Sequence, residues 1–147
     1  METVIRPFTL SDKDAVVEVW RACGLTHPNN DSHADIARKM KVDPEMFLVC
    51  EVDCKIIGTV MVGYEGHRGW INYLGVLPEY QDQGLGRALM DRAEAMLVER
   101  GCAKVNLQIR ATNTRVIQFY EGIGFKVDEV VSMGKRLGLD DNASHKL

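Results

Sequence analysis

The residues with the clearest capacity for chemistry lie in the stretch 77–90, LPEYQDQGLGRALM. Two glycines, Gly84 and Gly86, precede an apolar pattern typical of a helix. Glycines leave backbone amides accessible, the first amides of a helix lack internal partners, and the helix dipole favours negative charge at that end. The stretch therefore predicts an anion-binding loop, to which Arg87 could add a positive charge. An ordinary strand-to-helix loop explains the same residues equally well.

Two common phosphate-binding motifs do not fit this loop. A P-loop requires a lysine followed by serine or threonine after its last glycine, whereas Arg87 and Ala88 stand there. The dinucleotide fingerprint requires a third glycine where Leu89 stands, and it belongs near the first strand of a βαβ unit. The remaining interpretation is a pyrophosphate cradle that needs neither a metal ion nor a P-loop lysine.

Segments of β-rich and helical pattern alternate around this loop. We expect strands over residues 3–8, 46–52, 55–64, 70–77, 103–110 and 125–137. We expect helices from Ser11 to near Gly24 and over 34–42, 85–101 and 113–124. Short turns separate the strands between 46 and 77, which predicts an antiparallel meander. The strand–helix–strand pattern that follows predicts a parallel pair with a right-handed crossover.

The composition is typical of one soluble globular domain, with 147 residues, 46% hydrophobic and 27% charged. A net charge of −3 offers no basic surface for nucleic acid. The start, METVIRPF, lacks the pattern of a signal peptide, and no apolar run is long enough to cross a membrane. Four cysteines match no zinc or redox spacing and are expected as small buried residues in a reducing cytoplasm, with no metal.

Two motifs together resemble the GNAT family of N-acetyltransferases. The sequence QDQGLG at 81–86 resembles the family's Gln/Arg-x-x-Gly-x-Gly/Ala motif, which follows a strand ending in Val-x-Pro, here Val76 and Pro78. A second motif contains Asn113, Tyr120 and Gly124-Phe125 in the family's order and spacing. The resemblance covers nearly the whole chain, and the small bacterial enzymes that acetylate the N-terminal alanine of a ribosomal protein are similar.

The resemblance implies an α+β fold in three layers, with a mixed, splayed sheet of six to seven strands and about four helices. The single acetyltransferase domain would cover residues 1–138, and residues 139–147 would form a loose tail. A glycine is costly inside a strand unless something approaches its backbone, so Gly75 agrees independently with a ligand beside the central strand.

The implied cosubstrate is acetyl-CoA, whose pantetheine arm would lie between the two splayed central strands. Backbone groups of Leu74 and Val76 would hold that arm, a backbone amide there would stabilise the oxyanion, and amides from Asp82 to Arg87 would take the pyrophosphate. The binding residues implied by the resemblance are Leu74, Gly75, Val76, Gln81, Asp82, Gln83, Gly84, Leu85, Gly86, Arg87 and Asn113.

Tyr120 matches the family tyrosine that protonates the departing CoA thiolate. Outside the motif, a tyrosine on a helix face would be read as core, and Asn113 as a simple helix N-cap. Neither motif contains a cysteine, so the resemblance favours direct attack of the amine on the thioester in a ternary complex rather than an acetyl-enzyme.

The general base is the weak point of the resemblance. Relatives that acetylate the ribosomal protein have a glutamate five residues before the asparagine, where this chain has Gln108. Glu65 and His67 are candidates that fit an exposed turn better than a base, Tyr73 could anchor a water or pack in the core, and none of the three is assigned as the base. The polar segment 25–35 and the meander turns should form the acceptor site, and acidic groups in this segment would suit a cationic amine.

The sequence therefore predicts transfer of acetyl from acetyl-CoA to a small-molecule or peptide amine. A non-catalytic acyl-CoA-binding module remains an alternative, supported by Gln108 and opposed by Tyr120. A nucleotide-binding regulatory domain is a second alternative. We expect neither nucleic acid nor a membrane as partner. Sheet edges or the last strand could support a homodimer, as in relatives.

Overall fold

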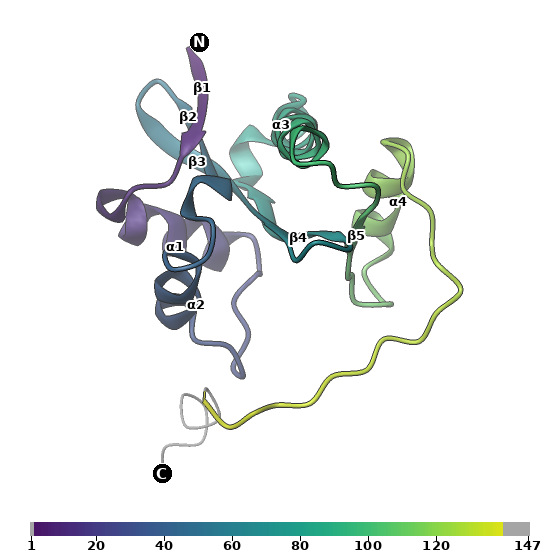
Figure 1. Cartoon of the computed structure of the whole chain (residues 1–147). Helices are drawn as coiled ribbons and strands as arrows, with labels where there is room; N and C mark the ends of the chain where they lie inside the picture. Colours follow the sequence, from purple (N-terminus) through teal and green to yellow (C-terminus); the bar gives the residue numbers. More distant parts are fainter. Residues whose placement is uncertain (1, 140–147) are drawn as a thin grey trace.

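The computed structural model describes residues 2–139, in which a five-stranded sheet carries helices on both faces (Figure 1). The strands, in spatial as well as sequence order, are β1 (Thr3–Pro7), β2 (Phe47–Val52), β3 (Lys55–Tyr64), β4 (Gly69–Val76) and β5 (Val105–Leu107). Neighbouring strands are antiparallel up to β4, and β4 and β5 are parallel. The predicted meander and the predicted parallel pair are both confirmed.

Helices cover both faces of this sheet, which confirms the expected α+β arrangement in three layers (Figure 1). The described α-helices are α1 (Lys13–Ala22), α2 (Ser32–Lys39), α3 (Leu85–Glu99) and α4 (Thr114–Gly122). Short 3-10 turns stand at η1 (Leu10–Asp12), η2 (Pro44–Met46) and η3 (Pro78–Tyr80). Helices α1 and α2 lie on one side, and α3 lies on the other with α4 beside it (Figure 1).

Strand β2 shows why two helical layers are needed. Its side chains alternate between the two faces, as in any strand. Phe47 and Val49 are buried in the cluster that contains Trp20 of α1, whereas Leu48 is buried in the cluster that contains Leu89 of α3. Because the strand is apolar on both faces, each face requires its own cover.

The prediction of a strand over 125–137 is wrong, and the described sheet has five strands rather than six or seven. This segment leaves α4 as an extended trace and curves back towards the side of α2 (Figure 1), where Arg136 donates to Oδ1 of Asn30 at 2.8 Å. It contacts β5 and the residues around it through side chains, from Asp128 to Lys104 and Asn106. Its valines favour an extended backbone, but a strand also needs backbone pairing with a neighbour.

Of the tail expected over 139–147, only Leu139 falls within the described residues. No helix in the described part of the chain is long and apolar enough to span a membrane.

Candidate active site

Strands β4 and β5 pair over a short distance and then separate. The ladder joins Gly69–Ile71 to Val105–Leu107, and β4 continues to Val76 without a partner on that edge. The amide of Leu77 donates to the carbonyl of Ile57 in the neighbouring chain segment at 2.8 Å. Because successive residues point their backbone groups to opposite edges, those of Val76 face the β5 side. The splayed sheet is therefore confirmed, and its open edge carries backbone groups, among them the amide of Val76.

A bulge in β4 lies at the start of this opening. Tyr73 has φ +54°, in the left-handed region, and β4 contains one residue more than β3 at this point of the ladder. The buried hydroxyl of Thr59 donates to the carbonyl of Tyr73 at 2.7 Å and accepts from Nε1 of Trp20 at 3.0 Å. The rings of Trp20 and Tyr73 stack with centroids 3.7 Å apart. These contacts hold a backbone conformation that a tyrosine rarely adopts alone.

The glycine loop presents its amides at the end of β4. Asp82 and Gly84 are left-handed, with φ of 62° and 79°, and Gly84 is the N-cap of α3. The first helical hydrogen bond runs from the amide of Ala88 to the carbonyl of Gly84 at 3.0 Å. The amides of residues 85–87 therefore precede the helical ladder, as an anion-binding N-terminus requires.

The Gln81 side chain bonds within the protein, and its contact with acetyl-CoA stays a prediction. Its side-chain amide donates to the carbonyl of Val76 at 2.9 Å, and the thiol of Cys23 donates to the same carbonyl at 3.3 Å. The Gln81 side chain thus fastens the loop to β4. Burial, reinforced by Glu79, raises the pKa of the Cys23 thiol and keeps it protonated, so it is a poor nucleophile.

The reason for Gly75 is found inside the protein. A Cβ built at Gly75 would lie 2.8 Å from Cδ1 of Leu25 and 3.2 Å from Sγ of Cys23. The close approach that the sequence indicated is therefore made by these two side chains, and Gly75 gives no independent support for a ligand. A Cβ at Gly86 would meet the ring of Phe119 at 3.4 Å, so this glycine lets α4 approach α3.

Tyr120 is buried on α4, with 6% of its surface exposed. Its ring packs edge-on against Phe119 and Phe125, at centroid distances of 5.1 and 5.4 Å. Burial raises the pKa of its hydroxyl well above the ordinary value for tyrosine. A phenol that keeps its proton suits a proton donor.

Asn113 is the N-cap of α4, and its side chain accepts from the amide of Val116 at 3.3 Å. The N-cap prediction is confirmed, while contact with acetyl-CoA stays a prediction.

The candidate bases separate clearly. Glu65 accepts hydrogen bonds from the amides of Arg68 and His67, which lower the pKa of its carboxyl, so it behaves as a turn residue. Gln108 is exposed and bonds to Ser132 of the extended segment. The Glu65 carboxylate is engaged in its own turn, and the amide of Gln108 has no basic group that could take a proton.

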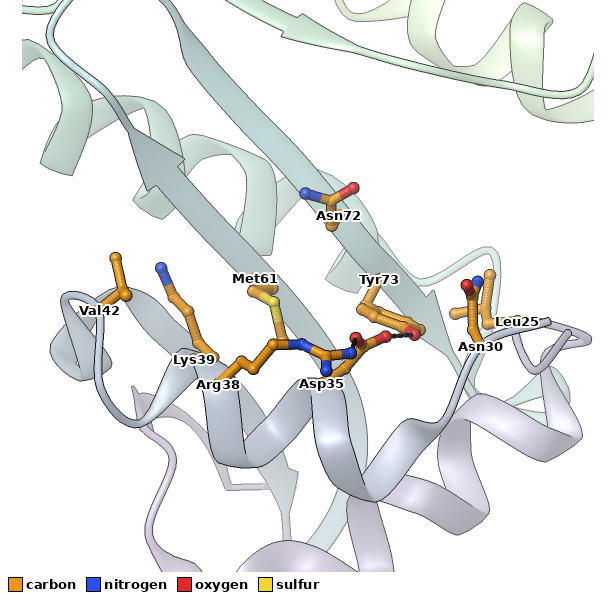
Figure 2. A pocket seen from close by; sticks show the side chains of 9 residues that line it. All are labelled: Leu25, Asn30, Asp35, Arg38, Lys39, Val42, Met61, Asn72 and Tyr73. Atoms are coloured by element: carbon orange, nitrogen blue, oxygen red, sulfur yellow. Dashed lines mark hydrogen bonds and ion pairs between the residues drawn. The ribbon is translucent and has the colours of Figure 1, made fainter. Parts of the chain in front are cut away.

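A pocket of about 550 Å³ opens beside the bulge, between α2 and strands β3 and β4 (Figure 2). It is lined by Leu25, Asn30, Asp35, Arg38, Lys39, Val42, Met61, Asn72 and Tyr73. The Tyr73 hydroxyl donates to Oδ2 of Asp35 at 2.5 Å, and Arg38 donates to Oδ1 of Asp35 at 2.6 Å (Figure 2). The structure thus brings Tyr73 of β4 to Asp35 of α2 and places one carboxylate at the bulge.

Sequence reasoning missed Lys39. This lysine is 8% exposed, and its ammonium donates to the carbonyl of Val62 at 2.5 Å. Burial lowers its pKa. Lys39 lies three residues after Ile36, which is 1% exposed, so the helical period placed it on the buried face.

Residues 13–125 match the model of the acetyltransferase (GNAT) family. The chain belongs to the GNAT family. A similar protein is an acetyltransferase of Yersinia enterocolitica, 45% identical over 136 residues, which covers 92% of this chain and 96% of that one.

Solved structures of other members share the fold. The ribosomal-protein-S18-alanine N-acetyltransferase of Escherichia coli is 23% identical, with a TM-score of 0.72 over 85% of this chain and 78% of that one. The PaiA N-acetyltransferase of Thermoplasma acidophilum, solved in complex with coenzyme A, is 21% identical, with a TM-score of 0.71 over 89% and 94% of the two chains. The described residues contain no group of three or more side chains suited to a metal ion.

Proposed function

We propose that the protein transfers the acetyl group of acetyl-CoA to a primary amine, by direct attack within a ternary complex. The observation that carries this proposal is the backbone at the end of β4: beyond Ile71 the strand pairs with no described residue on the β5 side, and the amides of residues 85–87 precede the helical ladder of α3. An extended arm with an anionic end fits this backbone. Family membership supports the same conclusion.

Backbone groups supply most of the binding in this proposal. Those of Leu74 and Val76 on the open edge would bond to the pantetheine arm. The amides of residues 82–87, with Arg87, would take the pyrophosphate, since a helix N-terminus and left-handed turns favour anions. Asn113, at the start of α4, would lie near the arm.

The chemistry then requires three assisted steps. The amine nitrogen attacks the thioester carbonyl, and a backbone amide of β4 stabilises the negative oxygen that forms. Asp35, which is in the pocket at the bulge, takes the proton that the nitrogen must lose. As the new C–N bond is kept and the C–S bond breaks, Tyr120 donates a proton to the departing thiolate. Positioning supplies much of the acceleration.

The non-catalytic acyl-CoA-binding alternative is not favoured. Proteins that resemble this chain over most of its length are named acetyltransferases, and Tyr120, whose hydroxyl has a pKa raised by burial, suits the proposed proton donor. The nucleotide-binding alternative has no separate support in the structure, and the experiment below distinguishes it.

Calorimetric titration with acetyl-CoA, 3′-dephospho-CoA and ADP tests the proposal first. We expect saturable binding that depends on the pantetheine arm, followed by thiol release when amines are added. Equal binding of ADP, or no binding of acetyl-CoA, would withdraw the proposed function.

The acceptor as a small molecule or peptide, and the homodimer, stay predictions. Exposed apolar side chains on the extended segment, such as Val131 and Met133, favour self-association. Light scattering should then give about twice the 16.5 kDa of one chain.

A further inference from the structure

The pocket at the bulge is lined by more positive than negative side chains, whereas the whole chain has a negative net charge. The chain has a net charge of −3. The pocket is lined by Arg38 and Lys39 beside one carboxylate, Asp35. An adjoining pocket, which shares Arg38 and Asp35, adds Lys135 and Arg136 from the extended segment. The described lining therefore carries an excess of positive charge, in a hollow where the field acts on a ligand more strongly than at an open surface.

The carboxylate of Asp35 is engaged but accessible. Its two oxygens accept from Tyr73 and Arg38, and its side chain remains 24% exposed. A carboxylate has about four lone-pair positions, so it can also accept from an ammonium group. This end of the pocket suits the amine of an acceptor.

Lys39 places a positive charge at the other end of the pocket, between Val42 and Met61 (Figure 2). Its ammonium carries three donors, and the carbonyl of Val62 takes one. No ion pair joins it to another described residue. The carboxylates that act on it from nearby, Asp43 and Glu45, are both ion-paired with Arg100.

Burying an ammonium with a single neutral partner costs free energy. Burial also lowers the pKa of Lys39, as expected for an ammonium without a carboxylate beside it. An acidic group from outside would supply the partner that the described residues do not.

We propose that the acceptor is an amine that also carries an acidic group, a carboxylate or a phosphonate, and that Lys39 binds this group. Asp35 takes the ammonium, and the aliphatic part of the acceptor contacts Leu25, Val42 and Met61. A free amino acid, or a short peptide with a free carboxyl end, has this chemistry. The inference rests on the proposed acetyl transfer and names its substrate class.

Thiol-release kinetics with matched amines test this inference. The core series is L-leucine, its phosphonate analogue, L-leucinamide and 3-methylbutylamine. The other common amino acids are assayed in the same way, each compared with its amide, so that acceptors with other side chains are included. Since a hydrogen bond between charged groups is lost with the neutral analogues, we expect kcat/KM for the acids to exceed that for the amides by about tenfold or more.

The variant Lys39→Met should remove this preference, mainly through a higher KM for the acids. Lys41→Met is the matched control, because Lys41 is exposed two residues away and lies outside the pocket lining. It should retain the preference. Methionine replaces a buried ammonium with an apolar chain of similar length, so we expect no loss of thermal stability.

The inference is overturned if amides react as well as acids in the wild-type protein, or if folded Lys39→Met keeps the preference. If acetyl-CoA binds but no amine releases thiol, the proposed acetyl transfer is contradicted, while the assignment of the pocket is still to be tested. Calorimetric titration of the same acids and amides into CoA-saturated protein then decides. Binding that favours acids and needs Lys39 supports the pocket assignment, and no binding of any acid overturns it.

Discussion

Replacing Thr59 by valine should destabilise the β4 bulge at Tyr73, beside which the pocket lies. Thr59 has no exposed surface, and its hydroxyl joins Nε1 of Trp20 to the carbonyl of Tyr73. Valine has nearly the same shape, but it can neither accept from Nε1 of Trp20 nor donate to the carbonyl of Tyr73. Removing one partner of a hydrogen bond inside a protein costs about 1–3 kcal/mol for each bond. The added methyl group recovers roughly 1 kcal/mol. We expect a loss of about 1–5 kcal/mol in the free energy of unfolding.

Urea denaturation measures this loss directly, as a lower midpoint at an unchanged slope. In thermal denaturation, a chain of this length should lose roughly 2–4 °C for each kcal/mol. Thr3→Val is the matched control, because Thr3 is an exposed strand threonine, and surface substitutions usually change stability by less than about 0.5 kcal/mol.

The same variant should lower turnover, since Tyr73 positions Asp35 through its hydroxyl. A loss of stability below about 1 kcal/mol, together with unchanged thiol release, would refute the reasoning that these hydrogen bonds hold the bulge.

Three further changes test the site. Gly86→Asp should weaken acetyl-CoA binding at least about tenfold by placing a carboxylate near the pyrophosphate, whereas Gly86→Ala should keep the wild-type affinity. Equal affinities of the two variants by calorimetry would contradict the assignment of this loop to the pyrophosphate. Tyr120→Phe should lower kcat about a hundredfold with CoA affinity unchanged, and a variant with full kcat would mean that Tyr120 has a purely structural role. Because burial raises the pKa of the hydroxyl, wild-type turnover should show no loss from Tyr120 deprotonation up to about pH 10. Gly75→Ala should lower the free energy of unfolding by about 1–3 kcal/mol, because the new Cβ meets Leu25. Gly63→Ala, whose Cβ would have nothing within 4 Å, should lower it less in the same urea assay, and equal losses would contradict the packing argument.

Much of the fold could be predicted from the sequence because the signals are local. The helices follow apolar residues at a period of 3.6, and the hairpin between β2 and β3 follows from its turn. In that turn Asp53 and Cys54 are left-handed, as a two-residue hairpin loop requires. The glycine loop at the start of α3 and the N-cap at Asn113 are likewise encoded in a few adjacent residues.

The last strand shows the limit of local signals. The β-branched residues of 125–137 favour an extended backbone, and the segment is extended. Whether it becomes a strand depends on an edge that can pair with it, which no property of the segment itself supplies.

By itself, the sequence determined most of the order of elements, the glycine loop before α3 and the resemblance to the family, because each rests on neighbouring residues. Only the tertiary structure decided the pocket at the bulge. Tyr73 meets Asp35 across 38 residues, and Trp20 meets Thr59 across 39. A bulge turns Tyr73 toward α2, and packing of α2 on the sheet buries Lys39. These contacts join segments distant in sequence, and burial and backbone conformation at such contacts follow from packing rather than from local pattern.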